Sequence, residues 1–257
     1  MTANPPAVQL YTVREQLEAS PRLAVLRSIA GFGYGAVEPY DVVTDPERLR
    51  DDLEEAGLAA CAAHARVVGS DDAHAYLAGA RTVGAGTVIV PSVKPERFAD
   101  ADSIGALARE LNEGAAKAAD YGLRFGYHNH WFELESDVGG TTGLEVLADA
   151  LDDDVVLEVD TYWAAVGGQD VPGLLARLGD RVRYLHVKDG PVTRDDPMTA
   201  VGQGRMPVAD ILAAAPQAEW HVVELDRCAT DMLTAVRESL EWLAGQGLAT
   251  PTGAGIQ

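Results

Sequence analysis

Short apolar segments alternate with amphipathic segments along almost the whole chain, and this alternation limits the possible fold more than any other feature. Eight apolar segments have the length of buried strands, and they cover residues 8–11, 36–39, 58–64, 87–91, 123–128, 155–160, 182–189 and 219–224. Each is followed by apolar residues at helical spacing, over about residues 21–29, 46–56, 70–83, 103–121, 141–151, 171–178, 206–215 and 230–245. Strands that alternate with helices in this way predict a parallel sheet.

Eight strand–helix units within 257 residues predict an α/β fold of the closed (β/α)8 type, a TIM barrel. No linker or low-complexity stretch separates the units, so residues 1–257 are expected to form a single domain. The segment from about residue 247 is rich in glycine, threonine and proline and is expected to be a flexible tail. A doubly wound open sheet is the alternative, but it usually needs fewer strands, and no glycine-rich dinucleotide fingerprint follows the first strand.

The charge of the chain narrows the choice of partners. It has 40 acidic and 20 basic residues and a formal net charge of -20. Nucleic acids and anionic membranes select basic surfaces, so neither is expected as a partner. The first residues lack the features of a secretory leader and no run has the length of a membrane span, so we expect a cytoplasmic protein. Cys61 and Cys228 lie too far apart to indicate a cysteine metal site or a disulfide scaffold.

Polar residues that could act as acids, bases or metal ligands follow six of the expected strands, at the ends where the strands run into loops. They are Glu38, His64, His128, His130, Glu133, Asp160, His186, Lys188, Asp189, Glu224 and Asp226. In a (β/α)8 barrel the carboxyl ends of the strands form the active site. Strand residues alternate sides, so His128 and His130 are expected to point the same way. Any one of these residues could be structural, but their coincidence at one end of the barrel predicts a functional site.

The residue types indicate the chemistry of this site. Imidazoles and carboxylates without a thiolate suit Mn(II), Zn(II), Co(II) or Mg(II) rather than Cu(I) or an iron–sulfur cluster. Acyl transfer by serine is unsupported, because the chain has no nucleophile elbow. A phosphate-cradling P-loop is also missing.

The chain resembles the xylose isomerase-like TIM-barrel superfamily, in the branch of the sugar phosphate isomerases and epimerases. The motifs that carry this resemblance span nearly the whole chain in the expected order. They are VQLYTVRE at 8–15, GAVEP at 35–39, GYHNHWFE at 126–133, LEVDTYW at 157–163, LHVKD at 185–189, GQG at 202–204 and VELD at 223–226.

The resemblance implies one divalent metal ion, Mn(II) or Zn(II) first and Co(II) or Mg(II) as alternatives. In that superfamily the metal is usually held by a carboxylate on strand five, an aspartate on strand six, a histidine on strand seven and a glutamate on strand eight. The motifs match Asp160, His186 and Glu224 to the last three. On strand five this chain offers His128 where relatives place a glutamate, and Glu133 is the alternative fourth ligand.

The reaction typical of the family removes a proton next to the carbonyl of a ketose or keto-sugar and passes through an enediolate. The resemblance thus implies an isomerase or epimerase of carbohydrate metabolism with a small sugar or polyol as substrate. Glu133 and Glu224 are the expected acid/base residues. Lys188 is expected either to polarise a substrate oxygen or to pair with Asp189, and Gln203 is a further candidate to reach the site. Residues expected to contact substrate are Glu38, His64, His130 and Trp163, the last as an apolar wall.

Three other functions stay open. A metal-dependent dehydratase or lyase acting on an inosose or a 3-keto-glycoside would begin with the same proton abstraction. Apurinic endonucleases share the superfamily, but Trp163 stands where such an enzyme would need a metal ligand, and the net charge repels DNA. A non-catalytic sugar-binding barrel is the third. Arg205 and Arg227 are isolated, so no phosphate-binding cluster identifies the sugar, and a homodimer is a further expectation because relatives are often dimers.

Overall fold

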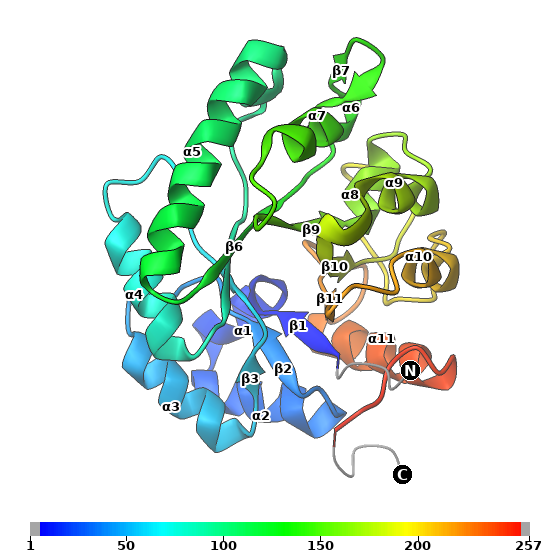
Figure 1. Ribbon diagram of the computed structural model, residues 1–257. Helices are drawn as coiled ribbons and strands as arrows, with labels where there is room; N and C mark the ends of the chain where they lie inside the picture. The colour runs from blue at the N-terminus through cyan, green and yellow to red at the C-terminus, as the bar shows by residue number, and fades with distance from the viewer. Residues whose placement is uncertain (1–5, 253–257) are drawn as a thin grey trace.

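The computed structural model describes residues 6–252, in which parallel strands form a nearly closed barrel. Figure 1 shows the strands in the middle of the molecule with the helices arranged around them. The sheet has the order β3-β2-β1-β11-β10-β9-β6-β5-β4. Its strands are β1 Ala7–Gln9, β2 Ala36–Glu38, β3 Ala59–Ala60, β4 Ala63–His64, β5 Thr87–Val90, β6 Arg124–His128, β9 Val156–Asp160, β10 Val182–Val187 and β11 Trp220–Val223. The TIM-barrel fold expected from the sequence is confirmed.

The barrel closes through the third expected strand, which the structure divides into β3 and β4. The first half pairs with β2 and the second half with β5, so the two ends of the sheet order belong to one stretch of chain. Cys61 N still donates to Val37 O, whereas Ala65 N donates to Ile89 O. The expectation of one continuous strand over residues 58–64 was therefore wrong, because the chain changes neighbours within it.

The helices follow the strands as expected. They are α1 Arg14–Ala19, α2 Arg22–Phe32, α3 Pro46–Ala56, α4 Ala73–Val83, α5 Ala101–Asp120, α6 Phe132–Glu135, α7 Gly143–Ala150, α8 Thr161–Val166, α9 Val171–Leu178, α10 Val208–Ala214 and α11 Met232–Gly245. Short 3-10 turns cover Leu10–Val13, Pro95–Phe98 and Gly179–Arg181. The sequence did not predict the short helices α1, α6 and α8, nor the hairpin of β7 Asp137–Val138 and β8 Thr141–Thr142.

Side-chain caps explain where several helices begin. Asp45, Asp100 and Thr142 each accept a hydrogen bond from a backbone N–H in the first turn of α3, α5 and α7. Such caps satisfy amides that have no partner inside the helix.

The interior of the barrel is apolar at one end and polar at the other. Ala7, Ala36 and Val222 from three strands and Cys61 from the link between β3 and β4 form one small buried cluster, against which Trp220 packs. Side chains along a strand alternate sides, so the inward residue two positions further lies nearer the carboxyl end. These inward residues are polar and buried, and they include Gln9, Glu38, Glu158, Asp160, His186 and Glu224.

The C-terminal segment continues past α11 and lies against α2. Leu248 N donates to Leu243 O, and Thr252 N donates to Gly33 O at 2.8 Å. Flexibility of the tail stays a prediction, and its last five residues lie outside the described chain. Within residues 6–252, no helix is long and apolar enough to cross a membrane.

Gly126 in β6 gives a test of barrel packing. A Cβ atom there would lie 2.9 Å from both the Val156 carbonyl oxygen and Val156 Cγ2. We therefore expect Gly126→Ala to lower the free energy of unfolding by about 1–3 kcal/mol, as measured by urea denaturation. The matched control is Gly105→Ala in α5, where the nearest atom is a side-chain nitrogen at 3.8 Å. This control should be neutral or stabilising, and equal stability of the two variants would contradict the packing argument.

Candidate metal centre

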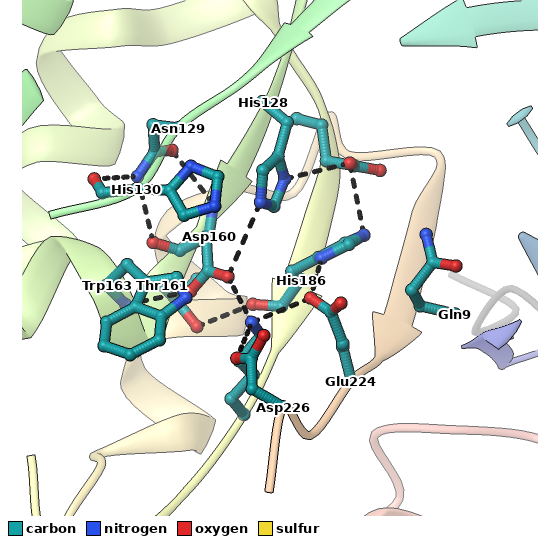
Figure 2. A network of polar contacts seen from close by, with 12 residues as sticks. Gln9, His128, Asn129, His130, Asp160, Thr161, Trp163, His186, Glu224 and Asp226 are labelled. Atoms are coloured by element: carbon teal, nitrogen blue, oxygen red, sulfur yellow. Dashed lines mark hydrogen bonds and ion pairs between the residues drawn. The ribbon is translucent and has the colours of Figure 1, made fainter. Parts of the chain in front are cut away.

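Four side chains from four strands meet at the carboxyl end of the barrel. His128 and Asp160 end β6 and β9, His186 lies in β10, and Glu224 directly follows β11. All four are buried, and one ligand-type atom of each lies within 4.8 Å of the others. Figure 2 shows the four side chains pointing toward a common space. The structure thus brings together Asp160, His186 and Glu224, which the resemblance matched to metal ligands. His128, the strand-five candidate that departs from the family pattern, joins them.

Local hydrogen bonds fix the orientation of Asp160. Its Oδ1 accepts from Trp163 N at 2.8 Å and so caps α8, and its own backbone N–H donates to Asn129 Oδ1 at 3.0 Å. Oδ2 is left to face the centre, 3.8 Å from His128 Nε2. The motif of residues 157–163 therefore serves the site directly, because it couples the end of a strand to the start of a helix.

Lys188 supplies a buried positive charge to the centre. Its Nζ lies 2.8 Å from Asp160 Oδ2, 2.7 Å from Glu224 Oε2 and 2.7 Å from Asp226 Oδ2. Burial opposes the charge, but the three carboxylates hold the pKa of Lys188 well above its usual range. The expected pairing of Lys188 with Asp189 was wrong. The carboxylate of Asp189 instead accepts hydrogen bonds from backbone N–H groups of the loop after β10, at Gly190, Gly202, Gly204 and Met206.

A second carboxylate layer, formed by Glu158 and Glu38, lies beneath the first. The sequence reasoning missed Glu158 and expected Glu38 to contact substrate. Glu158 Oε2 lies 2.7 Å from His64 Nε2, 3.0 Å from His128 Nδ1 and 3.1 Å from His186 Nε2. Glu38 Oε2 lies 2.8 Å from His186 Nε2. Strand alternation was the available signal, because Glu158 stands two residues before Asp160 and must face the same side.

Burial and neighbouring charge shift the pKa values of the two candidate ligand imidazoles in opposite directions. Burial and the nearby His186 lower the pKa of His128 well below its usual range. Burial also opposes the charge on His186, but Glu158 and Glu224 raise its pKa well above the usual range. Burial raises the pKa of Asp160 to about 6 despite the attraction of Lys188. A neutral imidazole such as His128 has the free lone pair that a metal ligand needs.

The centre opens into a cavity of about 290 Å³. Six lining residues were expected site or strand-end residues, namely His64, His128, His130, Lys188, Glu224 and Asp226. Six others were not expected, namely Tyr11, Tyr40, Arg66, Tyr76, Pro91 and Ser92. Asp160, His186 and Glu38 do not line the cavity but lie beside or beneath residues that do. The cavity therefore has a charged floor and partly aromatic walls.

Glu133 lies apart from the metal-type group. Its two carboxylate oxygens accept hydrogen bonds from Tyr127 OH at 2.8 Å and from His130 N at 2.9 Å. Burial raises the pKa of Glu133 to about 8. The residue does not line the cavity, so of the two strand-five candidates His128 is the one placed among the ligand-type atoms.

Trp163 and Gln203 also lie away from the cavity. Trp163 is buried, packs against Trp131 with ring centroids 4.9 Å apart, and lies 5.4 Å below the Lys188 ammonium. Gln203 Nε2 donates to Glu238 Oε2 on α11, so the expectation that Gln203 reaches the site was wrong. The aromatic side chains that do line the cavity are tyrosines.

The donor set fits a divalent cation. Two imidazoles and two carboxylates give a nitrogen–oxygen set typical of zinc or manganese sites, and all four groups are buried on rigid strand ends. The described residues also contain a second overlapping group of possible ligands, formed by His64, His128, Glu158 and His186. Both groups share two imidazoles.

Residues 26–246 match the family model described as xylose isomerase-like TIM barrel, and the chain belongs to this family. No curated protein is similar enough in sequence to count as a match. Among solved structures, a sugar phosphate isomerase/epimerase from Parabacteroides distasonis ATCC 8503 superposes with a TM-score of 0.81 at 20% identity, over 97% of this chain and 96% of that one.

Two further structures share the fold at lower identity. An L-ribulose 3-epimerase has a TM-score of 0.66 at 16% identity, over 95% of this chain and 94% of that one. The IOLI protein with a zinc atom has a TM-score of 0.67 at 15% identity, over 94% of this chain and 98% of that one. At these identities the likeness establishes the fold and leaves the activity to be argued from the site.

The raised pKa of Glu133 has a consequence for stability. The folded chain binds this proton more tightly than the unfolded chain, whose glutamate titrates near 4.5. The stability that the neutral carboxyl contributes is therefore lost progressively as the pH rises from about 4.5 to about 8. We expect Glu133→Gln to lack this component, so that its stability relative to the wild type rises across that window.

Urea denaturation of the metal-free protein between pH 5 and pH 8 measures this difference. The control is Glu113→Gln, which changes an exposed glutamate on α5 and should give a curve parallel to the wild type. A Glu133→Gln curve that is also parallel would show that the carboxyl is not held neutral by burial.

Proposed function

We propose that the chain is a divalent-metal-dependent sugar isomerase or epimerase that moves a proton at the carbon next to a carbonyl of a ketose or keto-sugar. One observation carries this proposal. Four side chains of metal-ligand type converge beside a cavity. One of them, Glu224, lines the cavity together with Lys188. Membership of the xylose isomerase-like family supports it.

His128, Asp160, His186 and Glu224 would hold the metal ion. Zn(II) or Mn(II) suits this nitrogen–oxygen set best, with Co(II) and Mg(II) as alternatives. When bound, the ion would supply Lewis acidity toward a carbonyl oxygen and a neighbouring hydroxyl of the substrate. The neutral state of His128 and the ionised state of Glu224 suit this role, since the pKa of each is held low.

Glu224 is the proposed proton carrier. It lines the cavity, and burial alone would raise its pKa, but Lys188 and His186 lower that pKa well below the usual range. The residue is therefore ionised and able to accept a proton. Lys188, charged and 2.7 Å from Glu224 Oε2, would stabilise the negative charge that develops on a substrate oxygen. Glu133 does not enter the proposed proton transfer, because it does not line the cavity.

The walls of the cavity suit a small polar substrate. His64 and His130 would contact hydroxyl groups from the floor, and Tyr11, Tyr40 and Tyr76 offer ring faces and hydroxyls from the wall. The volume lies near the lower end of the roughly 300–1,000 Å³ typical of small-molecule pockets. Glu38 and Trp163 would act behind this surface, by supporting His186 and Lys188.

A dehydratase or lyase is the second candidate, and the composition of the cavity favours it. The carboxylates that line the cavity within the described chain are Glu224 and Asp226, both from the end of β11. An epimerase that uses two carboxylates on opposite sides of the substrate would need one from another strand. Lys188 could instead donate a proton to a leaving group after the same first step.

Deuterium exchange tests the proposed reaction. The protein is incubated in D2O with Mn(II) or Zn(II) and a panel of ketoses, inososes and 3-keto-glycosides, and the products are read by NMR and mass spectrometry. We expect deuterium at the carbon next to the carbonyl, and loss of at least about 100-fold in exchange rate for Glu224→Gln. Gln203→Ala is the control and should retain the rate. Loss of water or an alcohol identifies a lyase, and absence of exchange in the whole panel contradicts the proposal.

Removal of the metal should destabilise the protein. A ligand that binds only the folded chain adds about 2.7 kcal/mol at 100 times its dissociation constant. Dialysis against a chelator should therefore lower Tm, and Zn(II) or Mn(II) should restore it. Asp160→Asn should lack this restoration, because it removes one ligand charge. If neither Zn(II) nor Mn(II) changes the Tm of the wild-type protein, the result would favour a non-catalytic sugar-binding barrel.

A further inference from the structure

Each ligand imidazole of the proposed metal centre has a carboxylate at both of its nitrogens. His186 Nδ1 lies 2.6 Å from Glu224 Oε2, and its Nε2 lies 3.1 Å from Glu158 Oε2. His128 Nε2 faces Asp160 Oδ2 at 3.8 Å, and its Nδ1 lies 3.0 Å from Glu158 Oε2. Each ring thus directs one nitrogen toward Asp160 or Glu224 and the other toward Glu158 Oε2.

If a cation is bound between the two rings and the carboxylates of Asp160 and Glu224, only one assignment of the ring protons is possible. An imidazole that binds a metal through one nitrogen carries its hydrogen on the other and donates it. His128 would bind through Nε2 and His186 through Nδ1. The remaining N–H of His128 would then donate to Glu158 Oε2. That of His186 would donate to Glu38 Oε2 at 2.8 Å, with Glu158 Oε2 beside it at 3.1 Å.

Glu38 contacts His186 but not His128, and it also lies 3.3 Å from His64 Nε2. Its Oε2 lies 2.8 Å from His186 Nε2 and accepts from Gln9 Nε2 at 2.7 Å. The Gln9 side chain is itself held by the backbone, since its Oε1 accepts from Tyr11 N at 3.0 Å. A chain of hydrogen bonds therefore runs from β1 through Glu38 to one ligand, while Glu158 serves both ligands.

We propose that Glu158 and Glu38 are positioning residues of the metal centre, which fix the ring orientation and the protonated nitrogen of His128 and His186. This inference rests on the metal site of the proposed function. Glu158 has the larger role, because one of its oxygens contacts both ligands and also His64 at 2.7 Å.

The ring geometry places Glu158 behind the ligands rather than among them. A cation held by Glu158 and His64 would bind His128 through Nδ1 and His186 through Nε2. The other two ring nitrogens would then have to donate to Asp160 and Glu224, but the 3.8 Å between His128 Nε2 and Asp160 Oδ2 is too long for a hydrogen bond.

Metal affinity of the purified full chain tests the inference without an activity assay. Zn(II) dissociation constants are measured by chelator competition for the wild type, Glu158→Gln, Glu38→Gln and Glu133→Gln. We expect a 10- to 100-fold loss for Glu158→Gln, and a smaller loss for Glu38→Gln. Glu133→Gln is the matched control, because it changes an equally buried carboxyl that touches neither imidazole, and it should bind as the wild type does.

The visible spectrum of the Co(II)-loaded proteins separates positioning from ligation. At saturation Glu158→Gln should keep the band intensity of the wild type, since the ligand set is unchanged. A spectrum of altered coordination number would overturn the inference by making Glu158 a ligand, and unchanged Zn(II) affinity in both Glu158→Gln and Glu38→Gln would overturn it as well. If Glu158→Gln does not fold, Glu38→Gln decides alone. A wild type that binds neither ion would instead overturn the proposed function.

Discussion

Mutual neutralisation of buried charges holds the carboxyl end of this barrel together. An ionised side chain that is buried without a partner destabilises a fold by several kcal/mol. Each of the buried groups here has a partner of opposite charge or a hydrogen-bond donor within about 3 Å, so the set is tolerated only as a unit. Its members are the carboxylates Glu38, Glu158, Asp160 and Glu224, the imidazoles His64 and His186, the ammonium of Lys188 and, as a neutral hydrogen-bond partner, His128. The site is consequently assembled by the fold before any cation or substrate arrives.

The alternation of short apolar segments with amphipathic segments was sufficient to predict the barrel. Short apolar segments such as residues 155–160 became strands, and segments with apolar residues at helical spacing, such as residues 103–121, became helices close to the expected bounds. Strand alternation also explains why the candidate ligands could be located. Asp160, His186 and Glu224 occupy inward positions near the ends of neighbouring strands, and a closed parallel barrel brings such positions together.

Features that depend on three-dimensional neighbours escaped the sequence. Trp163 follows the candidate ligand Asp160 in the chain, but α8 turns its ring into the packing against Trp131 instead of the cavity. Tyr40 reaches the cavity from a loop, whose direction no periodicity specifies. Glu158 was overlooked because a glutamate inside an apolar strand gains its meaning only from the three imidazoles across the barrel.

On strand five this chain has His128 where relatives have a carboxylate, and this difference is best understood together with Glu158 and Glu38 behind the imidazoles. In the proposed centre the four ligands carry two negative charges, from Asp160 and Glu224, which balance a divalent cation. Donation to a carboxylate makes an imidazole a stronger ligand. Glu158 would thus restore, from behind His128, part of the negative charge that a strand-five carboxylate supplies directly in relatives. The charge lies one hydrogen bond further from the cation, which leaves the cavity-facing side of strand five neutral and able to meet a hydroxyl rather than repel an anion.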